Sequence, residues 1–279
     1  MTTVGRRAWM CGVLAAAWGC RQRGGPDSED RTVRLVATTS VRDSGLLEPW
    51  ADWLDARFDA RIEVLAVGSG QAADLAIRGE ADLVLLHAPL HERRLLDQGI
   101  VQRHQVLMHN DFILVGPAAD PARIGDATDW RIAFQRIAAA NSPFVSRGDQ
   151  SGTHQREMKI WEAAGISPGS WVSRTGLGQA ATLRVADELS AYAIVDRATF
   201  LRHAANLALR EYAVRGEESR NEYRLMLINA ERRPMGSGGE ASRVFDAMVD
   251  SSSREFIEEF GRAELGTSLF EVESTGSAP

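Results

Sequence analysis

Short apolar runs alternate along this chain with segments whose apolar residues recur at helical spacing. Residues 33–37 and 62–67 are β-rich apolar runs. A short loop of Gly, Ser or Thr follows each run, and the helical patterns 46–58 and 71–78 come next. This order of strand, loop and helix is typical of an α/β fold whose strands are largely parallel.

The same unit recurs in the middle of the chain. The predicted strand 144–145 leads through a polar loop into a helix over 153–164, which Gly165 should end. A loop containing Gly176 and Gly178 precedes a predicted helix over 179–189. The remaining elements expected here are a strand at 82–87, a strand at 192–195 and a helix from Ala198.

Two further apolar runs, 112–115 and 223–228, lie on either side of this middle region. They are placed as strands that cross between two lobes would be. We therefore expect a two-lobed α/β fold with mixed, largely parallel sheets and a hinge. The first lobe should comprise 32–112 and 223–272, and the second lobe 113–222.

The beginning of the chain has the layout of a secretory leader. Arg6 and Arg7 precede an apolar stretch that is shorter than the roughly 20 residues of a membrane span. We expect a signal peptide over 1–19, lipidation of Cys20 because residues 17–20 resemble a bacterial lipobox, and a flexible tether over 20–31. An ordinary cleaved leader and a twin-arginine signal are the alternatives. Residues 273–279 should form a loose tail.

Charge and cysteine content narrow the possible partners. Without residues 1–19, which hold two of the 32 Lys and Arg residues and none of the 38 acidic ones, the net charge is near −8. An acidic domain of this kind is not expected to bind nucleic acid. Both cysteines, Cys11 and Cys20, lie before the predicted domain, so the domain must be stable without a disulfide.

Hydroxyl side chains gather where the predicted helices begin. A helix start offers unpaired backbone N–H groups and the positive end of its dipole, and nearby hydroxyls add donors. Several such starts facing one cleft would bind an anion. The alternative is that Ser40, Ser69 and Ser151 only cap their helices. The candidate ligands of this kind are Thr38, Thr39, Ser40, Ser69, Ser151 and Thr153.

Arg147 adds a full positive charge to the third of these loops. Its planar guanidinium group donates directional hydrogen bonds, which suit an oxyanion. Asp149 could accept a proton from a protonated ligand or could hold Arg147 in place. We favour the holding role, because a carboxylate in contact with a fully deprotonated anion would weaken binding.

Two other kinds of site are less well supported by the sequence. His87 and His91 are four residues apart, which suits a metal, but Pro89 lies between them and the predicted domain has no Cys ligand. A hydrolase would use Ser151, His154 and Asp149, but no nucleophile elbow precedes Ser151. We therefore expect neither a metal, a cofactor nor catalytic residues. The tryptophans are expected to pack in the core or on the surface of the lobes.

At these loops the chain resembles the TupA-like family, the tungstate-binding proteins of ABC importers, within the type II periplasmic binding fold. The resemblance covers nearly all of the chain after the leader. Two departures from the family pattern lie in the site loops: Ala37 and Val41 flank Thr-Thr-Ser, and Leu177-Gly178-Gln179 replaces Gln-Gly-Met. The segments that carry the resemblance are 37–40, 43–47, 67–71, 87–88, 110–117, 146–154, 181–184 and 186–188.

The resemblance implies a binding protein and not an enzyme. Hydroxyls of residues 38–40, Ser69, Arg147 and Thr153 would grip tungstate in a cleft that closes by hinge motion. The partners would be an ABC permease and, through Cys20, the membrane. We expect an exported, lipid-anchored monomer in the periplasm or on the outer face of the cell membrane. The alternatives are a receptor for phosphate, molybdate or sulfate, and, from other classes, a sensor domain or an esterase on this fold.

Overall fold

The computed structural model describes residues 32–59, 61–214, 216–232 and 238–272. The predicted leader, Cys20, the tether and the tail lie outside these residues. The strands are β1 (Thr32–Thr38), β2 (Arg61–Val67), β3 (Leu83–Leu86), β4 (Val101–Pro117), β5 (Phe144–Ser146), β6 (Val172–Arg174), β7 (Ala193–Asp196), β8 (Leu209–Tyr212), β9 (Arg220–Ile228) and β10 (Glu271–Val272).

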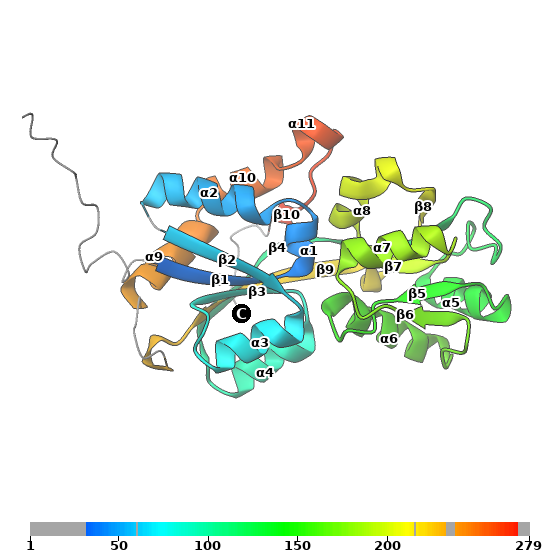
Figure 1. The fold of residues 1–279 in the computed structure, drawn as a ribbon, viewed down its shortest axis with the longest axis horizontal. Helices are drawn as coiled ribbons and strands as arrows, with labels where there is room; N and C mark the ends of the chain where they lie inside the picture. The colour runs from blue at the N-terminus through cyan, green and yellow to red at the C-terminus, as the bar shows by residue number, and fades with distance from the viewer. Residues whose placement is uncertain (1–31, 60, 215, 233–237, 273–279) are drawn as a thin grey trace, which may run out of the picture.

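Helices cover both faces of the sheets (Figure 1). The α-helices are α1 (Thr39–Asp43), α2 (Leu47–Phe58), α3 (Ser69–Ile77), α4 (Pro89–Asp97), α5 (Trp130–Ala139), α6 (Gly152–Ala164), α7 (Gln179–Glu188), α8 (Arg197–His203), α9 (Gly238–Val249), α10 (Ser251–Glu259) and α11 (Arg262–Leu265). The short 3-10 helices in the described ranges are η2 (Ala204–Asn206), η3 (Glu217–Ser219) and η4 (Ala230–Arg232). Within the described ranges, no helix is long and apolar enough to cross a membrane.

The first lobe is built on a mixed sheet. Its strand order is β10-β4-β9-β3-β1-β2, with β1 parallel to β2 and β3. Strand β9 runs antiparallel to its neighbours β3 and β4. In the first lobe, the expected parallel pairing therefore holds for β1 with β2 and β3, whereas the crossing strands β4 and β9 pair antiparallel.

Strand β4 is shared by both lobes. Asp111 still pairs with Arg220 on β9, whereas the next residue, Phe112, pairs with Asp196 on β7. Beyond this change of partner β4 also pairs with β8, and β5 pairs in parallel with β6. One continuous strand thus connects the two lobes, which lie side by side in Figure 1. The domain boundaries drawn from the sequence stay a prediction.

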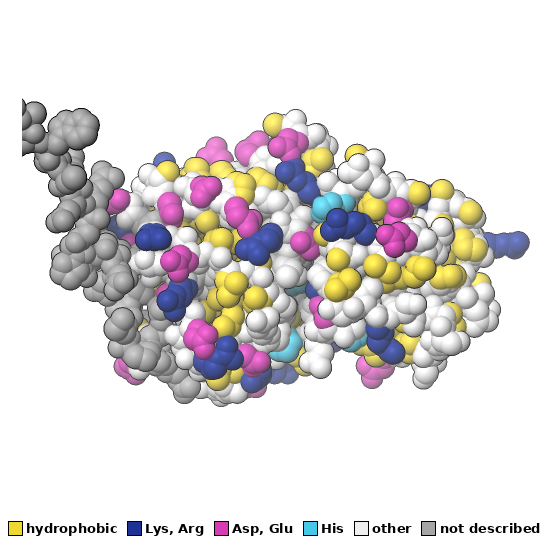
Figure 2. All heavy atoms as spheres, viewed as in Figure 1, with side chains coloured by type: hydrophobic (Ala, Val, Ile, Leu, Met, Phe, Trp, Pro, Cys, Tyr) yellow, Lys and Arg dark blue, Asp and Glu magenta, His cyan; other side chains and the backbone are white. Residues whose placement is uncertain are grey.

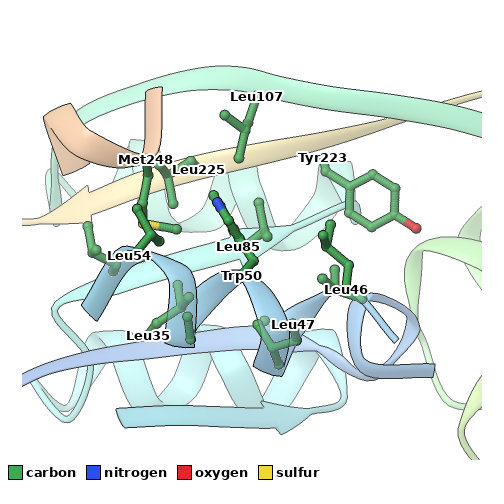
Figure 3. Close-up of a cluster of buried hydrophobic side chains, with 14 of the residues drawn as sticks. Leu35, Leu46, Leu47, Trp50, Leu54, Leu85, Leu107, Tyr223, Leu225 and Met248 are labelled. Carbon is green, nitrogen blue, oxygen red and sulfur yellow. The ribbon is translucent and has the colours of Figure 1, made fainter. Parts of the chain in front are cut away.

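Each lobe has its own apolar core. Trp50 on α2 is fully buried against the first sheet, where Leu35, Leu85 and Met248 surround it (Figure 3). Its indole Nε1 donates to Ser253 Oγ at 2.9 Å, so the polar atom of the ring is satisfied. Helices α3 and α4 cover the opposite face of this sheet.

The second lobe has an aromatic core. The ring centroids of Phe134 and Trp161 are 4.1 Å apart, and Phe144 packs edge-on against Trp161. Trp161 Nε1 donates to Glu157, whose pKa is raised to about 7 because the carboxyl group is buried. Trp50, Trp130 and Trp161 are all core residues, which confirms the packing role expected for them.

The main differences from the predicted elements lie next to the candidate site. A separate short helix, α1, begins at Thr39, before the predicted helix that the structure places in α2. Ser69 is the first residue of α3 rather than a residue of the preceding loop. The crossing strand β4 is also much longer than the apolar run 112–115, because its more polar first half pairs with β9 in the first sheet.

Candidate functional site

The candidate residues lie where α1, α3 and α6 begin, at the boundary between the lobes (Figure 1). These helices follow the ends of β1, β2 and β5, where ligands settle in open α/β sheets. Several contacts cross from one lobe to the other. Asp43 Oδ2 accepts from the Ala180 N–H at 3.0 Å, and His91 Nε2 lies 3.3 Å from the carbonyl oxygen of Gln150. The lobes are therefore closed on each other in this structure.

Part of this boundary remains open as a groove of about 570 Å³ between α4 and α6. His87 and Gly152 line it from opposite lobes. An added Cβ at Gly152 would lie 2.0 Å from the His87 carbonyl oxygen, so this approach of the two lobes requires glycine.

The first lobe contributes a cluster of hydroxyl groups. Thr38, Ser40 and Ser69 are almost completely buried, whereas Thr39 is partly exposed and lies next to Gly178 of the second lobe. Thr38 Oγ1 and Ser40 Oγ are 2.8 Å apart. Ser69 Oγ is buried and, among the described residues, has no hydrogen-bond partner.

His87 fixes the direction of the hydrogen bonds in this cluster. Asn221 Nδ2 donates to Asn110 Oδ1 at 2.7 Å, which leaves Asn221 Oδ1 facing His87 Nδ1 at 2.8 Å. Because an amide oxygen can only accept, His87 Nδ1 must carry a proton. Burial lowers the pKa of His87 to about 4, so the ring is neutral and Nε2 is an acceptor. Ser40 Oγ, 3.2 Å from Nε2, therefore donates its proton to His87, and Thr38 donates to Ser40.

The second lobe places one cation in the site. The Arg147 side chain is 2% exposed, and its Nη2 donates to Asp149 Oδ2 at 2.5 Å. Nη1 lies 3.4 Å from Gln179 Oε1, and Nε is buried without a partner in the described part of the chain. Burial opposes ionisation of Asp149, but the Arg147 charge and hydrogen bonds from Ser151 outweigh it and lower the pKa of that carboxyl group. Asp149 thus lies where it can hold Arg147.

The capping alternative holds for one of the three serines. Ser151 is the N-cap of α6, and its Oγ accepts from the His154 N–H at 3.3 Å. Ser40 and Ser69 are instead residues within α1 and α3, and neither helix has a side-chain cap among the described residues. Thr153 is buried in the first turn of α6 and donates to Gln179 Oε1 at 2.9 Å.

The metal and hydrolase hypotheses do not match this geometry. Both ring nitrogens of His87 are engaged by Asn221 and Ser40, and the described residues contain no group of three or more metal ligands. His154 Nδ1 accepts from the Gln150 N–H, and Ser151 Oγ accepts from the backbone N–H of His154 rather than contacting its ring. No Ser–His side-chain pair is formed at this position.

Three residues that sequence reasoning did not place in the site belong to its surroundings. Asp43 joins α1 to the start of α7, His87 orders the hydroxyls, and Gln179 contacts Arg147 and Thr153. Asp43 and His87 stood within the segments that carry the family resemblance, but nothing in the sequence indicated their contacts, because the partners are distant along the chain.

Chemically, the arrangement suits a small anion. Arg147 Nε and Ser69 Oγ are buried donors from opposite lobes that lack protein acceptors within the described ranges, and a buried unpaired donor is costly unless a ligand satisfies it. The positive charge that would attract an anion is that of Arg147 within the site. Acidic and basic side chains are interspersed over the face shown in Figure 2, without a continuous basic surface there.

A two-lobed fold with a closed interlobe site rich in donors defines a solute-binding protein. A family model described as the PBP superfamily domain matches residues 25–234. The chain belongs to this superfamily and, within it, to the TupA-like family of tungstate-binding proteins.

Individual relatives support this assignment. The tungstate-binding protein TupA of Peptoclostridium acidaminophilum is 35% identical over 272 residues, covering 92% of this chain and 93% of that protein. The crystal structure of the tungstate ABC transporter from Geobacter sulfurreducens superimposes with a TM-score of 0.76 at 31% identity, covering 83% of this chain and 99% of that one. These relatives confirm the predicted fold class and the prediction of a binding protein that is not an enzyme.

A third relative is longer. A Haloferax volcanii protein described as an anion-binding protein of an ABC transporter is 38% identical over 221 residues. The match covers 76% of this chain and 64% of that protein, so the chain spans less than two thirds of its length.

Proposed function

We propose that this protein captures a fully deprotonated tetrahedral oxyanion, tungstate in the first place, between its two lobes and delivers it to an ABC permease. The observation that carries this proposal is the pair of buried donors, Arg147 Nε and Ser69 Oγ, which no described residue accepts. The relatives named as tungstate-binding proteins support the choice of anion.

The arrangement of acceptors favours tungstate, molybdate or sulfate over hydrogen phosphate. A protonated anion needs an acceptor in the site, and Asp149 is the carboxylate beside Arg147. Its Oδ2 is engaged by Arg147 and its Oδ1 by the Ser151 N–H at 3.1 Å. An anion that offers only acceptors matches the two free donors, Arg147 Nε and Ser69 Oγ.

The proposed ligand set follows from these contacts. Arg147 and Ser69 would bind the anion directly, with backbone N–H groups at the helix starts. Thr38, Thr39, Ser40, Ser151 and Thr153 would shape the site, and Asp149 would hold Arg147. We further propose the lobe boundaries 32–112 with 223–272, and 113–222, with closure by bending at the shared strand. Export, lipid anchoring at Cys20, the monomeric state and the permease partner belong to the same proposal.

Calorimetry of the purified protein with tungstate, molybdate, sulfate and phosphate tests the proposal. We expect tungstate to bind most tightly, molybdate and sulfate to bind more weakly, and phosphate to bind weakest. Preference for phosphate would overturn the choice of anion while leaving the class of protein intact. Failure of all four anions to bind would overturn the function itself.

A further inference from the structure

Gln179 is a completely buried residue in the first turn of α7, and its side chain contacts the candidate site. The amide orientation follows from its neighbours. Nε2 faces the carbonyl oxygen of Ile194 at 3.3 Å, and a carbonyl oxygen can only accept. Oε1 faces Arg147 Nη1 at 3.4 Å, and an arginine nitrogen can only donate. Gln179 therefore directs an acceptor toward Arg147.

The same oxygen also takes the proton of Thr153. Thr153 Oγ1 lies 2.9 Å from Gln179 Oε1, and a threonine hydroxyl has one proton to donate. With that proton used, Thr153 offers an anion only lone pairs, which repel it. Thr153 has the position expected of an anion ligand but not a free donor.

Gln179 Oε1 thus accepts from two groups of the second lobe that an anion in the cleft would otherwise engage. We propose that Gln179 is an affinity-determining residue: its amide oxygen competes with the bound oxyanion for Thr153 and for one N–H of Arg147. This inference rests on the proposed function and names a residue that lowers the anion affinity of that same site.

A purely structural role for Gln179 predicts the opposite result. If the amide only filled space and satisfied Ile194, removing its oxygen would leave anion affinity unchanged or reduce it. Competition predicts that affinity rises when the acceptor is removed, since Thr153 and Arg147 then turn to the anion.

A substitution series at Gln179 measured by calorimetry with tungstate distinguishes the two roles. Gln179→Met keeps the length of the side chain without the acceptor, and we expect binding to tighten about fivefold or more because a charge-assisted hydrogen bond is gained. Gln179→Glu places a carboxylate at the same donors, and we expect binding to weaken about tenfold or more. An affinity for Gln179→Met equal to or below that of the wild type overturns the inference.

Thr153→Val completes a double-mutant cycle that needs no change in the fold. In the wild-type background we expect it to cost less than about threefold in affinity, and in the Gln179→Met background about fivefold or more. Thr182→Val is the matched control: it removes a buried threonine hydroxyl of α7, which contacts Thr175 at 2.8 Å, and should show no coupling to Gln179. A loss of tenfold for Thr153→Val alone contradicts the inference, whether or not Gln179→Met folds.

The cycle separates the two proposals. If the wild-type full chain binds none of the four oxyanions, the proposed function fails. If it binds tungstate and Gln179→Met and Thr153→Val act independently, only the role of Gln179 fails. Thermal unfolding of each variant, monitored by circular dichroism, shows whether the proteins compared are folded.

Discussion

The two lobes contribute to the site by different means. In the first lobe, Thr38 and Ser40 form a chain of neutral groups that ends at the uncharged ring of His87, and Ser69 keeps the free donor. In the second lobe, Arg147 is buried with its counter-charge Asp149 and still keeps Nε free. The second lobe thus holds the charge that attracts an anion, whereas the first lobe completes the coordination without adding charge.

This difference ranks the contributions of the two lobes to binding. A buried cation held by a carboxylate donates charge-assisted hydrogen bonds, which are about twice as strong as neutral ones. Neutral hydroxyls contribute less, and those already engaged by a neighbouring acceptor contribute least. The effects of substitutions in the two lobes should therefore differ in size, and the following predictions run from the largest effect on anion binding to the smallest.

Replacing Arg147 should have the largest effect. Arg147→Ala removes the buried charged donor that the second lobe contributes to the site, and we expect anion affinity to fall about a hundredfold. Arg147→Lys keeps the charge but loses the planar guanidinium group, and should lower anion affinity about tenfold or more. Arg103→Ala is the control, because Arg103 forms an exposed salt bridge with Asp246 far from the site. Unchanged affinity in a folded Arg147→Ala protein would show that the anion binds elsewhere.

Replacing Ser69 should have an intermediate effect. Ser69→Ala removes the free hydroxyl donor of the first lobe, so calorimetry with tungstate should show a loss of about five- to tenfold. Ser253→Ala removes a buried hydroxyl of the same lobe that accepts from Trp50, and should lower thermal stability without changing affinity. Equal losses for Ser69→Ala and Arg147→Ala would remove the distinction between the lobes.

The last prediction concerns stability rather than binding. Since the pKa of His87 is lowered from 6.5 to about 4, the unfolded chain takes up a proton at His87 before the folded protein does, and stability should fall as the pH drops through this window. Between pH 7 and pH 5 the wild type should lose about 2 kcal/mol more than His87→Gln in urea unfolding without anion.

Asp196 provides the internal check on that comparison. Burial raises its pKa to about 6, so this carboxyl group makes the folded state more stable as the pH falls, the opposite sign to His87. Both proteins carry Asp196, and its contribution cancels in the difference. An identical pH dependence in the two proteins would mean that His87 is not neutral in the folded state.

The strand–loop–helix units could be predicted from the sequence because their signals are local. Apolar runs, Gly and Ser loops and helical spacing follow one another directly along the chain, and they place Ser69 and Arg147 just after their strands. The roles of His87 and Gln179 could not be predicted, since they depend on Asn221 and Thr153, which folding brings near from other elements. Whether a hydroxyl is free or engaged also depends on neighbours of this kind, so Thr153 and Ser69 look equivalent in sequence.

The position of β9 in the first sheet has a consequence for the order of folding. Residues 220–228 lie between β3 and β4, yet they come after nearly all of the second lobe in the chain. As the polypeptide emerges from a ribosome or a translocation channel, the second lobe is complete while β3 and the first half of β4 still lack the strand between them. Pairing this distant is slow, because the ends of a long loop must meet. The lobe that begins the chain is therefore the lobe that finishes last, and until it does its unpaired strand edges are open to chaperones and to aggregation.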